Sequence, residues 1–171
     1  DNAVKEGKAL YVGISNYNTE QTSKIKKIFD ELKTPFIINQ PSYSMLNRWI
    51  EEDGLKDYAY ENGLGLAVFS PLAQGLLTDK YLKTNTGSSS RPWMKSQPDE
   101  NTLKKLKKLN EIAANRGQKL SQMALSWVLR DDKITTVLIG ASRPEQITEN
   151  LQAVFKTDFS QEELTAIEDT L

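Results

Sequence analysis

Four short apolar runs, each followed by a helical pattern, constrain the fold of this chain more than any other feature. The runs cover Ala9 to Ile14, Phe36 to Asn39, Gly65 to Phe69 and Ile134 to Ile139. They are mostly continuous rather than alternating, which is typical of parallel strands covered on both faces. Strands that alternate with helices form right-handed βαβ units. The sequence therefore predicts an α/β fold with a parallel sheet.

The helical patterns have clear starts and stops. Asn18 or Thr19 is a candidate cap for the first, Gly63 is a natural left-handed stop for the second, and Ser160 with Glu163 forms a predicted capping box for the last. The opening residues, DNAVKEGKAL, are typical of a helix end that leads into a strand. The predicted helices cover Thr19 to Lys33, Gly54 to Asn62, Thr102 to Arg116, Ser121 to Arg130 and Ser160 to Leu171.

Four βα units are half of a (β/α)8 TIM barrel, which typically has about 250 residues, whereas this chain has 171. Two explanations compete: a complete small open α/β domain, or the last four βα units of a barrel whose first half is missing. A half barrel alone would expose two strand edges and the inner face of its sheet, with a risk of aggregation. The abrupt opening at Asp1 favours the second explanation. We predict that residues 1–171 are the C-terminal half of a single barrel domain.

Composition excludes several classes of protein. A composition of 38% hydrophobic and 26% charged residues is typical of a folded domain. The net charge of -1 gives no excess of positive charge, which a nucleic-acid-binding protein would need. The cluster Lys104, Lys105, Lys107 and Lys108 has acidic neighbours and indicates a solvated helix face. No apolar run is long enough to span a membrane. The absence of cysteine and histidine removes thiolate sites and the commonest general base. These features predict a cytoplasmic protein without membrane insertion.

Candidate ligand-binding residues follow the ends of the predicted strands, because parallel α/β folds bind ligands outside the carboxyl ends of their strands. Ser15, Asn16 and Gln40 offer donors and acceptors suited to a carboxamide, and capping of the following turns is the equally weighted alternative. Phe69 offers an aromatic face on which a flat ring could stack, although a core-filling role is commoner. The third run continues as Ser70-Pro71-Leu72-Ala73-Gln74-Gly75.

The fourth run continues as Gly140-Ala141-Ser142-Arg143 and predicts a phosphate site. Ser142 with Glu145 matches a capping box, and Pro144 suits a first helical turn. The amides at such a helix start would face outward and attract phosphate, and Arg143 adds a planar donor fork. Glu149 and Asn150 follow one turn later. The loop from Thr84 to Glu100 is rich in Ser, Pro and Gly, and we expect it to be mobile or ordered by a ligand.

The segments VGISNYN, INQPSYSMLNR, AVFSPLAQGLLTDKY and VLIGASRPEQITENL resemble the C-terminal half of the aldo-keto reductases, in the order and register of that family. These segments are most similar to the sequences of a bacterial branch of the family, which is related to potassium channel β subunits and to reductases of glyceraldehyde 3-phosphate-like aldehydes. The resemblance implies a (β/α)8 barrel that binds NADPH across its carboxyl-terminal rim and reduces small carbonyl substrates by hydride transfer.

The resemblance also implies roles for individual residues. Ser15, Asn16 and Gln40 would hold the nicotinamide carboxamide, and Phe69 would stack on the nicotinamide ring. Ser70, Leu72, Gln74 and Gly75 would line the pyrophosphate, with Lys80 and Arg91 as cationic neighbours. Ser142 and Arg143, which follow Gly140, would receive the adenosine 2′-phosphate, and Gln146, Glu149 and Asn150 would frame the adenine. Many members have an arginine at the position of Gln146, so the preference for NADPH would depend on Arg143.

The chain departs from the family in one essential respect. The family's proton donor is a Tyr tuned by a Lys, an Asp and a His, and all four come from the first half of the barrel. Tyr17, Tyr43 and Lys80 are not at matching positions, and the chain contains no histidine. We therefore predict no catalytic residue here and expect this segment alone to be inactive.

The sequence is compatible with three functions. The first is an NADPH-dependent aldehyde or ketone reductase, of which this chain is the cofactor-binding half and the missing N-terminal half is a partner. The second is a nucleotide-sensing regulatory subunit, as in channel-associated relatives. The third is a phosphate-binding half barrel that covers its edges as a homo-oligomer, although we expect the isolated chain to aggregate instead of forming a clean dimer.

Overall fold

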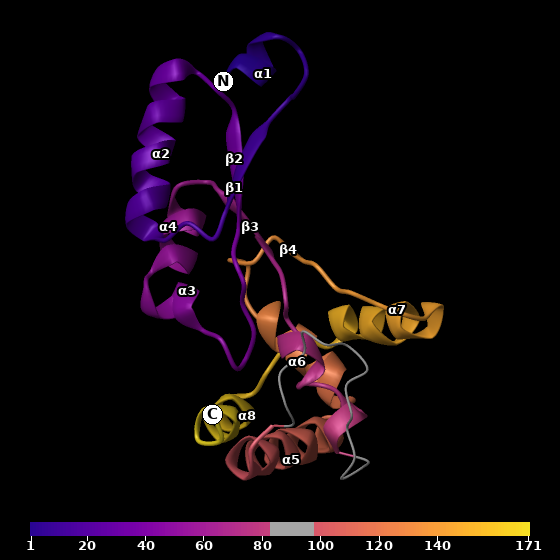
Figure 1. The fold of residues 1–171 in the computed structure, drawn as a ribbon. Helices are drawn as coiled ribbons and strands as arrows, with labels where there is room; N and C mark the ends of the chain where they lie inside the picture. Colours follow the sequence, from indigo (N-terminus) through magenta and orange to yellow (C-terminus); the bar gives the residue numbers. More distant parts are fainter. Residues whose placement is uncertain (83–97) are drawn as a thin grey trace.

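The computed structural model describes residues 1–82 and 98–171, and within them the four predicted strands form one parallel sheet in the order β1-β2-β3-β4. Each strand pairs with its sequence neighbour, so every connection is a crossover that contains helix. Figure 1 shows the strands with α2, α3 and α4 on one side and α6 and α7 on the other. The strands are β1 (Val12–Ser15), β2 (Phe36–Gln40), β3 (Gly65–Val68) and β4 (Thr136–Val137).

The helices confirm most of the predicted segments, with bounds that move by a few residues. Asp99 caps α5 by accepting from the Thr102 amide at 2.7 Å, so this helix begins two residues before its predicted start. Gly63 ends α4 with a φ of +66°. The helices are α1 (Asn2–Lys5), α2 (Thr19–Leu32), α3 (Trp49–Glu52), α4 (Leu55–Glu61), α5 (Glu100–Asn115), α6 (Leu120–Val128), α7 (Pro144–Leu151) and α8 (Gln161–Glu168), with short 3-10 turns η1 (Ala73–Gly75), η2 (Asp79–Tyr81) and η3 (Gln152–Phe155).

Two expectations about the strands are wrong. The first and fourth strands are shorter than predicted, because β1 starts only at Val12 and β4 pairs with β3 over two residues. Burial is also one-sided in β1, where half-buried and exposed residues alternate. Along β3, by contrast, the last three residues are all buried. Each end strand has a neighbour on one side only within the described residues, which explains both differences.

The core lies where β3 meets the helices that follow it. Leu66 and Val68 of β3 are fully buried, and they belong to one cluster with Leu106 and Leu109 of α5 and Trp127 of α6. Side chains of this size stabilise a domain by about 1.5 to 3 kcal/mol each when fully buried. This packing fixes the β3 end of the sheet, and with it the loops that leave β3 and β4.

A charged network at the edge of this core joins α3, α6 and the loop after β2. The Glu51 carboxylate accepts from the Tyr43 hydroxyl at 2.5 Å and pairs with Arg130 at 2.7 Å and Arg48 at 2.6 Å. Arg130 also stacks on Trp127, with 3.7 Å from the guanidinium carbon to the ring centroid. Burial raises the pKa of Glu51, but hydrogen bonds from Tyr43, Arg130 and Arg48 outweigh it and lower that pKa to about 2.

Candidate functional site

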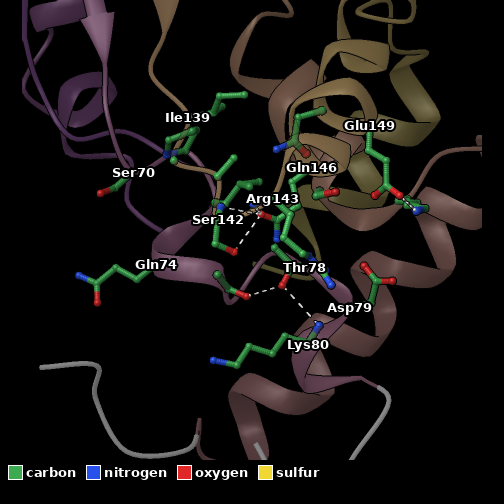
Figure 2. A pocket seen from close by; sticks show the side chains of 18 of the residues that line it. Ser70, Gln74, Thr78, Asp79, Lys80, Ile139, Ser142, Arg143, Gln146 and Glu149 are labelled. Atoms are coloured by element: carbon green, nitrogen blue, oxygen red, sulfur yellow. Dashed lines mark hydrogen bonds and ion pairs between the residues drawn. The ribbon is translucent and has the colours of Figure 1, made fainter. Parts of the chain in front are cut away.

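A cleft of about 1090 Å³ lies between the loops that follow β3 and β4. Figure 2 shows side chains from both loops and from the start of α7 around this cleft. It is as large as the pockets that hold small molecules and cofactors in other proteins. The structure brings together at this cleft most of the residues predicted after the third and fourth strands: Ser70, Leu72, Gln74, Gly75, Lys80, Gly140, Ser142, Arg143, Gln146, Glu149 and Asn150.

The β3 loop makes its wall of the cleft with an uncommon backbone. Ser70, Ala73 and Gln74 have left-handed φ values of 57°, 47° and 57° without being glycines. Thr78 holds the end of the turn, since its hydroxyl donates to the Gly75 carbonyl at 2.7 Å. Residues kept in this region cost free energy and cluster at functional sites. The strained turn points the Gln74 side chain away from the packed core and leaves it exposed, as Figure 2 shows.

The β4 loop differs from its prediction at the start of α7. Arg143, and not Ser142, is the cap residue, and Pro144 takes the first helical position. The predicted capping box of Ser142 with Glu145 is therefore wrong by one residue. The reason is that Gln146 reaches back over the turn, where its Oε1 accepts from the Ser142 amide at 2.8 Å and from the Arg143 amide at 3.1 Å.

This arrangement corrects the idea of outward-facing, unoccupied amides at the helix start. Both amides already donate to Gln146, and the Ser142 hydroxyl also lies 3.2 Å from the same oxygen. A phosphate at this turn would meet the Ser142 hydroxyl and the Arg143 guanidinium first. It would reach the amides only by displacing the carboxamide of Gln146.

Only one of the three cations that line the cleft has a carboxylate partner among the described residues. Lys119 is neutralised by Glu149, with 2.9 Å between the Nζ and Oε1 atoms. Lys80 and Arg143 line the cleft without a carboxylate partner among the described residues; Lys80 lies 5.3 Å from the centroid of the Tyr81 ring. Two cations available on opposite loops favour an anion with more than one charged group.

The ends of β1 and β2 are joined to each other, and their predicted residues Ser15, Asn16 and Gln40 are not among those that line the cleft. The Ser15 hydroxyl donates to the Gln40 carbonyl at 2.9 Å, and Asn16 Oδ1 accepts from the Ser42 amide at 3.2 Å. Asn16 has a left-handed φ of 57°. These two bonds tie the end of β1 to the end of β2 and its loop, and they do not cap the turn that follows β1. The carboxamide of Gln40 has no hydrogen-bond partner in residues 1–82 and 98–171 and stays available for a ligand.

Phe69 connects the two groups of loop residues. It is half-buried, and it pairs with Ser42 of the β2 loop by a parallel bridge. A second cleft of about 690 Å³ lies against it and shares Ser70 and Gln74 with the first. Phe69 therefore faces a ligand-sized space instead of filling the core, as a stacking role requires.

Several lining residues escaped prediction, and one predicted residue cannot be placed. Thr78, Asp79, Lys119 and Ser121 line the first cleft. The expected helix start at Ser121 could have flagged Lys119, which immediately precedes α6, but nothing in the sequence shows that α6 approaches α7. Arg91 and most of the Thr84 to Glu100 loop lie outside the described residues. No cluster of metal-ligating side chains and no helix able to span a membrane occurs in the part that is described.

The model of the aldo/keto reductase family matches residues 1–171, which is the whole chain. The chain belongs to the aldo/keto reductase family. It is 49% identical to an L-glyceraldehyde 3-phosphate reductase of Escherichia coli K12 over 97% of this chain and 50% of that protein. A probable voltage-gated potassium channel β subunit of Oryza sativa is 32% identical over 88% of this chain and 48% of its own length.

Solved structures of aldo/keto reductases and related oxidoreductases have the same fold. The glycerol dehydrogenase of Gluconobacter oxydans superposes with a TM-score of 0.78 at 26% identity, and a thermostable aldo-keto reductase in complex with the inhibitor epalrestat does so with a TM-score of 0.71 at 25% identity. Both alignments cover 99% of this chain and about half of the other protein. The chain thus spans about half the length of the relatives it matches.

Proposed function

We propose that this aldo/keto reductase chain is the NADPH-binding part of an oxidoreductase that reduces small aldehydes or ketones. One observation carries the proposal: the cleft between the β3 and β4 loops gathers most of the residues that the family resemblance assigns to the pyrophosphate and adenosine end of the cofactor. Lys80 and Arg143 suit the pyrophosphate and 2′-phosphate groups, since neither has a carboxylate partner among the described residues. The chemistry of the cleft therefore fits a dinucleotide with an additional phosphate.

The residues of this chain would bind and orient the cofactor. Gln40 and Asn16 would fix the carboxamide end, Phe69 would support the flat ring, and the β3 loop would hold the phosphates. When bound, NADPH supplies the hydride for carbonyl reduction. Exclusion of water by Leu72 and Pro71, both on the wall of the cleft, would strengthen the electrostatic contacts there.

The proton donor would come from outside this chain. Tyr43 is fully buried, its hydroxyl donates to Glu51, and burial raises its pKa above the ordinary value, so it is unsuited to give up a proton to a substrate. This supports the proposal that residues 1–171 are the C-terminal half of one barrel domain and that the N-terminal half carries the catalytic groups. A cytoplasmic location and any homo-oligomer remain predictions.

A titration and an activity assay test this function. NADPH fluorescence should change on binding to a complete barrel that contains this chain, whereas the chain alone should not oxidise NADPH in the presence of glyceraldehyde 3-phosphate, the aldehyde named for the Escherichia coli relative. Absence of NADPH binding would overturn the cofactor assignment. Turnover by the chain alone would overturn the assignment of the proton donor to another segment.

A nucleotide-sensing role is the second candidate, because several relatives are described as potassium channel β subunits. The same cleft would serve both functions, since sensing also requires the cofactor to bind. A complete barrel that binds NADPH but turns over no small aldehyde would favour the sensor. Turnover of any small aldehyde at a rate well above background favours the reductase.

Replacing Gln40 by Ala should weaken NADPH and NADH alike. The unpartnered carboxamide would contact a part that the two cofactors share, and one neutral hydrogen bond is worth about 0.5 to 1.5 kcal/mol, or roughly a two- to twelvefold change in Kd. Calorimetric titration of both cofactors gives the two values. Gln161→Ala offers a control at an exposed Gln of α8, and unchanged affinity in Gln40→Ala would mean that Gln40 has only a structural role.

Replacing Gln146 by Glu should weaken NADPH about fivefold more than NADH. The carboxylate would hold the amides of Ser142 and Arg143 more tightly than the carboxamide does, since charge-assisted hydrogen bonds are about twice as strong. It would also repel a 2′-phosphate. Gln152→Glu adds the same charge at the other end of α7 and should change neither Kd much. A Gln146→Glu chain that keeps its ratio of NADPH to NADH affinity contradicts this account.

A further inference from the structure

The main chain of Phe69 is hydrogen-bonded to the loop after β2 through both of its polar groups. The Phe69 amide donates to the Pro41 carbonyl at 3.0 Å, and the Phe69 carbonyl accepts from the Tyr43 amide at 3.2 Å. These two bonds make the parallel bridge between Phe69 and Ser42. The place of Phe69 at the second cleft therefore depends on where residues 41–43 lie.

The side chain of Tyr43 ties this loop to the charged network around Glu51. Tyr43 is fully buried, and its ring centroid lies 5.6 Å from that of Trp127. Its hydroxyl donates to the Glu51 carboxylate at 2.5 Å and accepts from the Arg130 guanidinium at 3.0 Å. Arg130 also donates to Glu51, at 2.7 Å. The three groups form a closed triangle, which holds the hydroxyl from two directions.

We propose that Tyr43, held by Glu51 and Arg130, is a positioning residue for Phe69 and, through it, for the nicotinamide ring. The inference rests on the proposed cofactor function and extends it to residues that touch no ligand. Tyr43, Glu51 and Arg130 line neither of the two clefts. They would act through the two main-chain bonds between Phe69 and the β2 loop.

Stability alone does not account for a polar triangle at this buried place. A buried ion pair can often be replaced by apolar side chains of similar volume without loss of stability. An apolar side chain at position 43 would still pack against Trp127, but it would make no directional bond. Three hydrogen bonds fix the direction of the Tyr43 side chain and hence the loop. Such precision matters at a cofactor ring, since a misplacement of about 1 Å can cost roughly a hundredfold in rate.

Replacing Tyr43 by Phe in a complete barrel that contains this chain removes the hydroxyl and keeps the ring. The Kd for NADPH should rise about threefold, since an aromatic stack changes Kd by roughly two- to twelvefold and would be lost in part. The Kd for adenosine 2′,5′-bisphosphate, which lacks the nicotinamide, should stay unchanged. Calorimetric titration measures both. An unchanged ratio of the two Kd values overturns the proposal, because a purely structural loss would weaken both ligands or neither.

Hydrogen exchange tests the same assignment without any cofactor. The amides of residues 43 and 69 should exchange about fivefold faster in Tyr43→Phe, because they donate the bonds that join the two loops. Tyr58→Phe is the matched control. Tyr58 packs against the same core, and its hydroxyl has no hydrogen-bond partner among the described residues. This control should change neither the exchange nor the ratio of Kd values, and unchanged exchange in Tyr43→Phe overturns the proposal.

Arg130→Lys gives a second test that leaves Tyr43 intact. Lys lacks the planar fork that holds the Tyr43 hydroxyl and Glu51 together, so the ratio of Kd values should change in the same direction. Arg116→Lys is its control, because Arg116 is also buried and pairs with Glu163 of α8. It should lower stability and leave the ratio unchanged. An equal change of the ratio in both variants overturns the proposal.

The two kinds of failure can be told apart. A barrel that binds neither NADPH nor the bisphosphate would refute the proposed function. The hydrogen-exchange result would then still decide whether Tyr43 positions Phe69, since that measurement needs no ligand.

Discussion

Replacing Arg143 by Ala should raise the Kd for NADPH about 10- to 150-fold and leave the Kd for NADH nearly unchanged. The guanidinium lines the cleft without a carboxylate partner among the described residues and flanks the turn where the 2′-phosphate is proposed to bind. A charge-assisted contact is worth about 1.5 to 3 kcal/mol, which gives that range. NADH lacks the phosphate and would lose no such contact. Calorimetric titration with both cofactors measures the two values.

Lys107→Ala is the matched control for this experiment. Lys107 lies on the exposed face of α5, outside the cleft, so its loss changes the net charge by the same amount without removing a contact. Both affinities should stay within about twofold of the unaltered chain. Equal weakening of NADPH and NADH binding in Arg143→Ala would refute the role of Arg143 at the 2′-phosphate. It would instead indicate that Arg143 contacts the pyrophosphate, which both cofactors share.

Replacing Glu51 by Gln should lower the free energy of unfolding by about 3 kcal/mol. The carboxylate faces Arg130, Arg48 and, at 3.6 Å, Lys56. Arg48 and Lys56 keep Glu168 and Asp131 as partners, but the loss of the carboxylate leaves the largely buried Arg130 without one among the described residues. Removal of one partner of a buried ion pair typically costs about 3 to 5 kcal/mol. Urea unfolding followed by Trp fluorescence measures the change. Glu52→Gln alters an exposed neighbour in the same helix and should shift the midpoint little.

The lowered pKa of Glu51 predicts how the free energy of unfolding changes in acid. The pKa of Glu51 lies near 2 in the folded chain, below its ordinary value of 4.5. A lowered pKa gives stability that is fully present above about pH 4.5 and is lost as the pH falls toward 2. Glu51→Gln should therefore flatten the stability profile between these limits. A variant that loses stability with acid as steeply as the unaltered chain would place the acid-sensitive group elsewhere.

The parallel α/β fold and the family could be predicted because their signals are local. Apolar runs such as GLAVF mark strands, and Ser160 with Glu163 marks a helix start; the capping bonds of that pair are present at 2.9 and 3.2 Å. The helix α3 escaped prediction because four residues are too short to show a period. The cap of α7 was misplaced because Ser142 has the better capping side chain, whereas the long Gln146 reaches both amides at once.

Residues that line the cleft could be predicted where they lie in the loop after a strand, as Ser70 and Ser142 do, since the carboxyl ends of parallel strands meet at one rim. Lys119 was missed because its place depends on how α6 packs near α7, which no local pattern encodes. Its pairing with Glu149 decides which cations remain available to a ligand.

By itself, the sequence determined the order of strands and helices, the family and the rim where a cofactor would bind, because these depend on side-chain periodicity and on motifs within single segments. Only the tertiary structure decided which polar groups are still available at that rim. Hydrogen bonds between residues distant in sequence, such as Ser15 to Gln40, consume some donors and leave others, such as Arg143, unpaired.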